Sequence, residues 1–158
     1  WLRYIDEVPT PAVRVPTFAN LLAPMRFARA NDDEFRAHAA KLPLRKEFYE
    51  RMSQKGFARD DFDNAMLQLR QTCERIERAV TETGGPWVLG ELFSIVDITL
   101  TPSIQRMADM GYAYLWEDLP RMVQWFEDIK ARPSFAAAFY PGTNLTEKYP
   151  EFFQDAGA

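Results

Sequence analysis

The fold is decided by one stretch, which reads Gly84-Gly85-Pro86-Trp87-Val88-Leu89-Gly90-Glu91-Leu92-Phe93-Ser94-Ile95-Val96-Asp97-Ile98. Ser94 and Asp97 have the spacing of a helix capping box. In such a box the Ser94 hydroxyl accepts from the Asp97 N–H and the Asp97 carboxylate accepts from the Ser94 N–H. Phe93 and Ile98 occupy the two positions of a hydrophobic staple over that box. The stretch therefore predicts a helix that begins at Ser94 with a carboxylate at the positive end of its dipole.

Two segments downstream complete the pattern, namely Leu119-Pro120-Arg121-Met122-Val123-Gln124-Trp125-Phe126 and Ala131-Arg132-Pro133-Ser134-Phe135. In order and spacing, the box and these segments resemble the C-terminal all-helical domain of the cytosolic glutathione S-transferases of bacterial type. The similarity extends more weakly over nearly the whole chain. The resemblance implies an all-α bundle of about five main helices, with the helix that starts at Ser94 at its centre.

The resemblance also implies a domain organisation. In the family, the Ser, Tyr or Cys that activates glutathione lies in an N-terminal thioredoxin-like domain, and no βαβ pattern precedes the helices of this chain. The chain opens at Trp1 inside a helical pattern. We expect an all-helical domain over residues 1–140, an irregular tail over 141–158, and a thioredoxin-like domain that is absent from this chain. No residue of the chain is then expected to be catalytic, and the chain alone is expected to be inactive.

Composition limits the other possibilities. The chain has 158 residues, is 47% hydrophobic and carries a formal net charge of −4, which fits one domain with a real core. Mixed, mildly acidic charge argues against nucleic acid as the main partner. No apolar run of about 18 residues predicts a membrane span. The single Cys73 excludes an internal disulfide and fits a reducing cytoplasm, and with the single His38 it cannot make a Cys/His zinc site.

The first half of the chain is predicted to be helical with interruptions. Residues 1–8 carry an apolar stripe of helical period, and Pro9, Pro11 and Pro16 predict a kink or break near 9–16. Asn31 predicts the cap of a short helix over 32–40, and 45–53 favours another turn or two. The clearest helix spans 61–82, capped by Asp60 or Asp61, with Glu74 and Arg78 as an ion pair four residues apart. Its apolar seam consists of Phe62, Met66, Leu69, Cys73, Ile76 and Val80.

The second half of the chain is also predicted to consist of helices that proline and glycine begin and end. The helix that begins at Ser94 is predicted to end at Gly111, and Pro120 opens the next, which runs out at Ala131-Arg132. Pro133 starts a last short helix expected to carry Phe135 and Phe139 into the core. A turn of helix is expected at 145–149.

Three residues that could carry chemistry have simpler interpretations. Cys73 lies in the apolar seam and is expected to be a buried structural thiol. His38 lacks an orienting partner in the pattern and is expected at the surface. Asp97 is explained by the capping box, as is its counterpart in the family.

The glutathione contacts of this domain are implied by the resemblance. In the family, polar residues of the first helix reach glutathione, often across the dimer, and the matching positions here are Arg3, Asp6, Glu7 and Thr10. A carboxylate there would pair with the α-ammonium group of glutathione. The alternative is that Arg3, Asp6 and Glu7 are the solvated face of an amphipathic helix. Some bacterial relatives carry a His near position 10, where this chain has Thr10, so no acid–base role is transferred.

The second substrate of the family binds in an apolar pocket built from the first helix and the loop after the central helix. The matching residues here are Arg14, Phe18, Gln105, Tyr112 and Trp116. An apolar, aromatic lining suits hydrophobic electrophiles. The prolines at 9, 11 and 16 are hypothesised to widen this pocket by bending the first helix away.

The function implied is conjugation of the glutathione thiolate to an apolar electrophile, by a cytoplasmic homodimer with glutathione as co-substrate, bound mainly by the missing domain. A glutathione-dependent ether-cleaving or dehalogenating relative remains an alternative. So do a non-catalytic interaction module of the same family and a stand-alone helical domain that binds an apolar ligand. No nucleic-acid, membrane or metal partner is expected.

Overall fold

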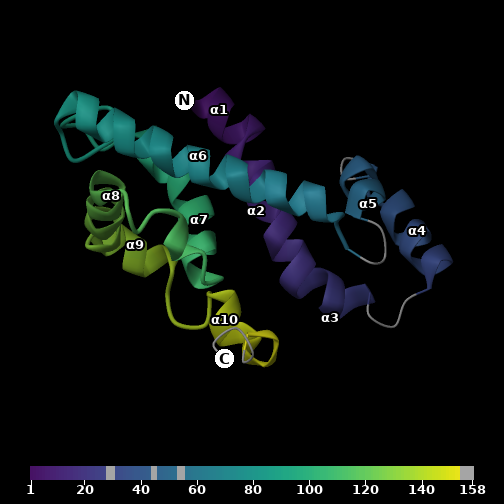
Figure 1. Cartoon of the computed structure of the whole chain (residues 1–158). Helices are drawn as coiled ribbons and strands as arrows, with labels where there is room; N and C mark the ends of the chain where they lie inside the picture. The colour runs from purple at the N-terminus through teal and green to yellow at the C-terminus, as the bar shows by residue number, and fades with distance from the viewer. Residues whose placement is uncertain (28–30, 44–45, 53–55, 154–158) are drawn as a thin grey trace. The chain divides into compact units, whose positions relative to one another are not determined.

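The computed structural model describes residues 1–27, 31–43, 46–52 and 56–153. Every regular element in these residues is helical, and an isolated bridge between Trp87 and Gly90 is the single β feature among them. The predicted all-α fold is therefore confirmed (Figure 1). None of the described helices is long and apolar enough to cross a membrane.

The helices follow one another along the chain as in Figure 1. Their bounds are α1 (Leu2–Glu7), α2 (Pro9–Thr17), η1 (Phe18–Leu22), α3 (Ala23–Phe27), α4 (Asp32–Ala40), α5 (Lys46–Met52), α6 (Arg59–Thr83), α7 (Ile95–Asp109), η3 (Ala113–Leu115), α8 (Pro120–Lys130), α9 (Pro133–Ala138), α10 (Leu145–Lys148) and η4 (Pro150–Phe152). They form two compact parts. The main part consists of residues 1–13 and the described residues from 67 onward, and the second part consists of residues 14–66.

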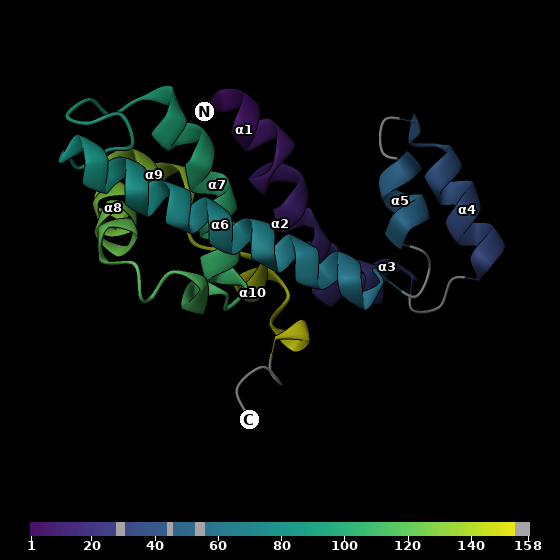
Figure 2. The same ribbon diagram turned by 45° about the horizontal axis from the view of Figure 1, so that its top comes forward.

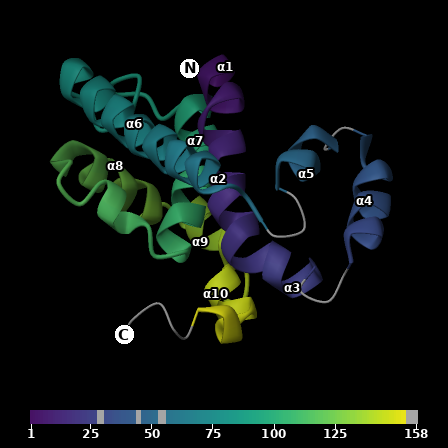
Figure 3. The ribbon, with the colours of Figure 1, turned by 45° about the vertical axis from the view of Figure 1, so that its right-hand side comes forward.

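The core of the main part lies between α6, α7 and α8. α7 crosses behind α6 in Figure 1, and α8 lies beside α6 in Figure 2 and Figure 3. The seam predicted for α6 is buried there at Leu69, Cys73, Ile76 and Val80, whereas Phe62 and Met66 are only half-buried. Asp60 and Asp61 lie within the first turn of α6 and not at a cap, so that expectation was wrong. The buried apolar residues of α7 and α8 are Val96, Leu100, Ile104, Met107, Met122, Trp125, Phe126 and Ile129.

The carboxylate of Asp97 joins three segments of this core. The predicted capping box is present, and Asp97 accepts from the Ser94 N–H and hydroxyl at 2.9 Å each. The same fully buried carboxylate accepts from the Val88 N–H at 3.0 Å and from the Trp125 indole N–H at 2.9 Å. Asp97 thus ties the turn before α7, α7 itself and α8 together.

The turn before α7 depends on two glycines. Trp87 and Gly90 exchange backbone hydrogen bonds of 3.1 and 2.9 Å, and Gly90 has a φ of +97°. A Cβ on Gly85 would come within 2.3 Å of the Gly90 carbonyl carbon, so only glycine fits at position 85.

The prolines of the first helix interrupt it at one of the predicted places only. The helix breaks at Val8, but α2 then begins at Pro9 and continues through Pro11 and Pro16. Proline is tolerated in a first turn because the N–H it lacks has no intrahelical partner there. The irregularity comes after Pro16, as the π-helical turn η1. The hypothesis that Pro11 and Pro16 bend the helix away from a pocket is therefore not supported.

The second part has an aromatic core of its own. Phe35, Tyr49 and Met52 are buried in it, with Phe18 and Phe48 packed against them. The predicted helix over 32–40 is present, and Asn31 and Glu34 form a second capping box. The expectation that His38 lies at the surface was wrong, because the half-buried imidazole packs edge-on against Tyr49 at 5.4 Å. Residues 45 and 53, the ends of the next predicted helix, fall outside the described residues, and α5 fills the space between.

The end of the chain also differs in two respects. Phe135 and Phe139 are half-buried and line an open groove, so α9 does not carry them into the core as predicted. The predicted turn of helix near 145–149 is α10, and it is anchored on the end of α7. The Asp109 side chain, 2% exposed, accepts from the N–H of Leu145 at 2.7 Å and from the hydroxyl of Thr146 at 2.6 Å.

Replacing Asp97 by Ala is expected to lower the free energy of unfolding by about 3 kcal/mol or more, because it leaves the donors of Val88 and Trp125 buried without an acceptor. Urea denaturation of wild type and variant measures the difference. Trp125→Phe, which removes one donor only, is expected to lose less. The control is Asp63→Ala, which breaks an exposed pair with Arg59 and should cost about 0.5 kcal/mol or less. Equal losses for Asp97→Ala and Asp63→Ala would contradict the role given to Asp97.

Candidate functional site

The four residues expected to meet glutathione lie on the first turns of the chain. Arg3 and Glu7 are exposed and form an ion pair of 2.9 Å across one turn of α1. Asp6 is exposed and has no ion pair in the described part of the chain, and Thr10 is half-buried at the start of α2. The four therefore do not form one cluster of available groups, because Arg3 and Glu7 pair with each other whereas Asp6 pairs with no cation among the described residues.

The five residues expected to line the substrate pocket divide between the two parts. Arg14 is exposed on α2, and Phe18 packs edge-on against Phe48 at 4.8 Å, inside the aromatic core of the second part. Phe18 therefore has a packing role that the sequence pattern did not reveal.

The other three belong to the main part. The amide of Gln105 donates to the side chain of Asn144 at 3.1 Å and so helps to hold the C-terminal segment. Tyr112 is half-buried and lies edge-on to Tyr114 at 6.2 Å. Trp116 is only 4% exposed and packs against Phe126, so its ring supports the loop from behind.

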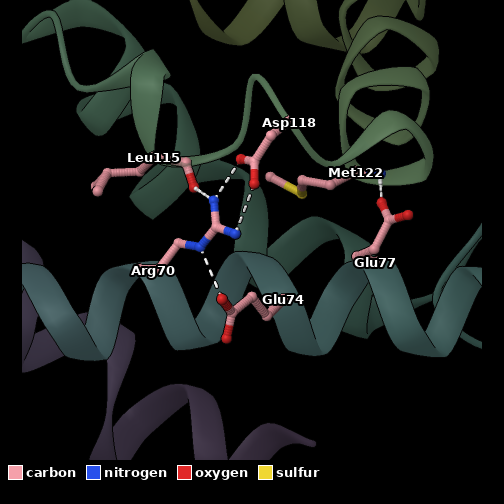
Figure 4. A network of polar contacts seen from close by, with 6 residues as sticks. All are labelled: Arg70, Glu74, Glu77, Leu115, Asp118 and Met122. Carbon is pink, nitrogen blue, oxygen red and sulfur yellow. Dashed lines mark hydrogen bonds and ion pairs between the residues drawn. The ribbon is translucent and has the colours of Figure 1, made fainter.

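Arg70 holds the loop of residues 110–119, which carries Tyr112 and Trp116 (Figure 4). Its guanidinium donates to the Leu115 carbonyl at 3.0 Å, to both carboxylate oxygens of Asp118, and to Glu74 at 2.8 Å. These hydrogen bonds with Arg70 lower the pKa of the Asp118 carboxyl and raise the pKa of Arg70 itself. The loop is thereby fixed to α6 by one cation.

A second bond on the same face of α6 continues this attachment. Glu77 accepts from the Met122 N–H at 2.7 Å, which satisfies a free donor in the first turn of α8 (Figure 4). The sequence pattern paired Glu74 with Arg78, and the structure pairs it with Arg70 instead. The roles of Arg70, Glu77 and Asp118 were missed in the sequence because these bonds join residues that are at least 45 positions apart along the chain.

An apolar groove opens in the main part, between α7 and α9. It has a volume of about 330 Å³ and is lined mainly by Phe93, Ile98, Pro102, Ile129, Phe135 and Phe139. Phe93 and Ile98, the predicted staple residues, thus share a wall of this groove. Arg132 lies over the ring of Phe93 at 3.6 Å. Leu92, Ile95 and Ile98 are 78, 55 and 50% exposed beside it, which makes this face unusually apolar for a surface.

The only thiol of the chain, that of Cys73, is unreactive. Cys73 is fully buried in α6, as predicted, and burial raises the pKa of its thiol to about 12. A thiol in this state is neutral at physiological pH and cannot act as a nucleophile.

The sequence-family model of the glutathione S-transferase C-terminal domain matches residues 29–128, from the second part through most of α8. The chain belongs to this family. It is similar to the 2,5-dichlorohydroquinone reductive dechlorinase of Sphingobium indicum, in each of two strains, with 30% identity over 126 residues. The match covers 72% of this chain and 36% of the relative, so it spans little more than a third of the length of these relatives. No solved structure matches the chain significantly.

Replacing Arg70 by Met should release the 110–119 loop, and hydrogen exchange of the amides of Leu115, Trp116 and Leu119 is expected to rise roughly tenfold or more. Because the pKa of Asp118 is lowered in the native state, the stability from this pair is present above the ordinary carboxyl pKa of about 3.9 and is lost as the pH falls through the lowered value. The difference in unfolding free energy between Arg70→Met and wild type should therefore shrink below about pH 4.

Arg78→Met is the matched control, since Arg78 lies on the same helix and forms no ion pair with a described residue. Its loop amides should exchange at the wild-type rate. Equal exchange in the two variants would show that Arg70 does not hold the loop.

Stability at high pH should report on Cys73. Its native pKa is raised, so the unfolded thiol ionises first, and stability is lost as the pH rises from about 8.5 towards about 12. The slope from this one group is about 1.4 kcal/mol per pH unit. Cys73→Ala should lose less stability over the same range. In denaturation at pH 7.5 and 10, parallel losses for the wild type and Cys73→Ala would argue against a buried, neutral thiol.

Proposed function

We propose that the protein is a glutathione-dependent enzyme in which the glutathione thiolate attacks an electrophilic carbon of an apolar substrate. This helical domain would supply the wall of the substrate site, part of a homodimer interface and a contact to glutathione. The observation that carries the proposal is the family match over residues 29–128. A cytoplasmic location fits the single, reduced Cys73.

The activating residue is proposed to lie outside these 158 residues, in a thioredoxin-like domain. The one cysteine of the chain, Cys73, is buried and its thiol is neutral, so it does not supply that residue. The 158-residue chain by itself should then be inactive.

The apolar face formed by Leu92, Ile95, Ile98 and the groove between α7 and α9 supports this organisation. Exposed apolar surface of this kind is ordinarily covered by a partner or another domain. We assign this face to packing against the thioredoxin-like domain, which leaves α1 and the 110–119 loop for glutathione and substrate.

Among the proposed glutathione contacts, Asp6 is the best placed to bind the α-ammonium group. It is exposed, and no cation of the described chain forms an ion pair with it. Arg3 and Glu7 would have to exchange their mutual ion pair of 2.9 Å for bonds to glutathione, and Thr10 can offer only a hydroxyl. Among the proposed substrate contacts, Arg14 and Tyr112 are accessible, whereas Phe18, Gln105 and Trp116 act by holding their surroundings in place.

Dehalogenation is the second candidate, favoured by the dechlorinase relatives. The same thiolate attack would then form a carbon–sulfur bond and displace chloride from a chlorinated ring. For hydrogen to take the place of chlorine, a second glutathione would have to reduce the resulting thioether, with release of glutathione disulfide. The identity of 30% over little more than a third of those relatives supports the reaction class and not a particular substrate.

The test is a pair of assays on the full-length gene product with glutathione. Conjugation is followed with chlorodinitrobenzene, and dehalogenation is followed as chloride release from 2,5-dichlorohydroquinone. Turnover in either assay that disappears without glutathione supports the proposal, and chloride release favours the second candidate. Asp6→Asn should raise the KM for glutathione more than it lowers kcat, and Asp128→Asn, on α8, is the matched control.

A folded full-length protein that neither binds glutathione in calorimetric titration nor turns over either substrate would overturn the enzyme proposal. A non-catalytic interaction module of the same family would then be the better description.

A further inference from the structure

A polar hollow of about 680 Å³ lies between α1 and α6, on the main part of the molecule. Trp1 and Tyr4 form its wall on the α1 side, and Glu74, Arg75, Arg78 and Glu82 line it from α6. It is distinct from the apolar groove between α7 and α9, with which it shares no lining residue.

Arg75 is held in this hollow by aromatic rings and not by a carboxylate. Its guanidinium lies over the ring of Tyr4 at 4.1 Å and over the ring of Trp1 at 4.7 Å. The two rings meet edge to face at 5.9 Å, so they form a corner that orients the cation. Ring contacts occupy a face of the guanidinium and leave its N–H groups at the edge available for an acceptor.

Arg78 follows one turn later on the same face of α6. No carboxylate of the described residues forms an ion pair with Arg75 or Arg78. The nearest candidate by sequence, Glu74, is already bound to Arg70 at 2.8 Å. The hollow therefore presents two neighbouring guanidinium groups whose charges no ion pair within the described residues satisfies.

We propose that this hollow binds a small organic dicarboxylate, with one carboxylate on Arg75 and the other on Arg78. Guanidinium groups bind carboxylates through paired, charge-assisted hydrogen bonds. Three residues of α-helix separate the Cα atoms of Arg75 and Arg78 by about 4.5 Å along the axis, and both side chains line the same hollow, so a short carbon chain can join a carboxylate on each. A single compact ion such as phosphate offers one anionic group in place of two separate carboxylates, so it suits a pair of guanidinium groups less well.

The dicarboxylate has two possible sources with the same chemistry. One is a free dicarboxylic acid. The other is a peptide with two carboxylates, such as glutathione, whose ammonium group could in addition meet Glu82. The probes are therefore glutarate and glutathione, with inorganic phosphate as the comparison ion.

The experiment is calorimetric titration of the full-length protein at low ionic strength with each probe. Glutarate is expected to bind more tightly than phosphate. The Arg75→Gln/Arg78→Gln double variant should weaken glutarate binding at least tenfold, because each loses a charge-assisted pair. Arg59→Gln is the matched control: it removes the same charge from the same helix outside the hollow and should leave binding unchanged.

Glutathione is identified as the ligand if two results are found together. The double variant must lose glutathione affinity to a similar extent, and the wild-type protein must bind more than one glutathione per chain. An effect on glutarate alone identifies a free acid. The proposal is overturned if the protein does not bind glutarate, or if Arg59→Gln loses as much glutarate affinity as the double variant. It is also overturned if the protein forms a dimer that buries Arg75 and excludes glutarate. Glutarate binding is measured without turnover, so this proposal and the proposed enzyme function can fail independently of each other.

Discussion

The structure of the main part depends on a fully buried carboxylate. Burying a charge is unfavourable unless hydrogen bonds replace the lost water, and Asp97 accepts four of them from Val88, Ser94 and Trp125. Each donor comes from a different segment or from the cap of α7. The fold therefore cannot bury this charge at low cost without also placing the preceding turn and α8 correctly, which makes one residue specify the packing of three elements.

A different arrangement holds the opposite end of α7. In the loop of residues 110–119 the buried apolar side chains are Met110, Leu115 and Trp116. Arg70 fixes the loop to α6 through bonds to Leu115 and Asp118, and Glu77 fixes the start of α8 through the Met122 N–H. The Asp109 carboxylate does the same for α10. Polar contacts thus set the position of the segments on which the proposed substrate contacts lie, while apolar packing sets the helices beneath them.

The sequence was sufficient where the signal is local. The capping box at Ser94, the short helix after Asn31, the seam of α6 and the proline that opens α8 are all read from residues within one or two turns, and each is present. The interactions missed are those between distant residues: the indole of Trp125 on Asp97, Arg70 on the loop, and Phe18 in an aromatic core. His38 was misplaced for the same reason, since Tyr49, which buries it, lies on another helix. The proposed site residues were the least predictable, because the family pattern gives the position of a residue on a helix but not the neighbour with which its side chain already forms a contact.

The π-helical turn Phe18–Leu22 has a consequence for comparisons along this family. A π turn holds one more residue than an α turn, so the helical face downstream is rotated by about 100° relative to an uninterrupted α-helix. A relative with a regular helix here would align with this chain only through a one-residue gap. Without that gap, every position from Ala23 to Phe27 would be compared with a residue from a different side of the helix.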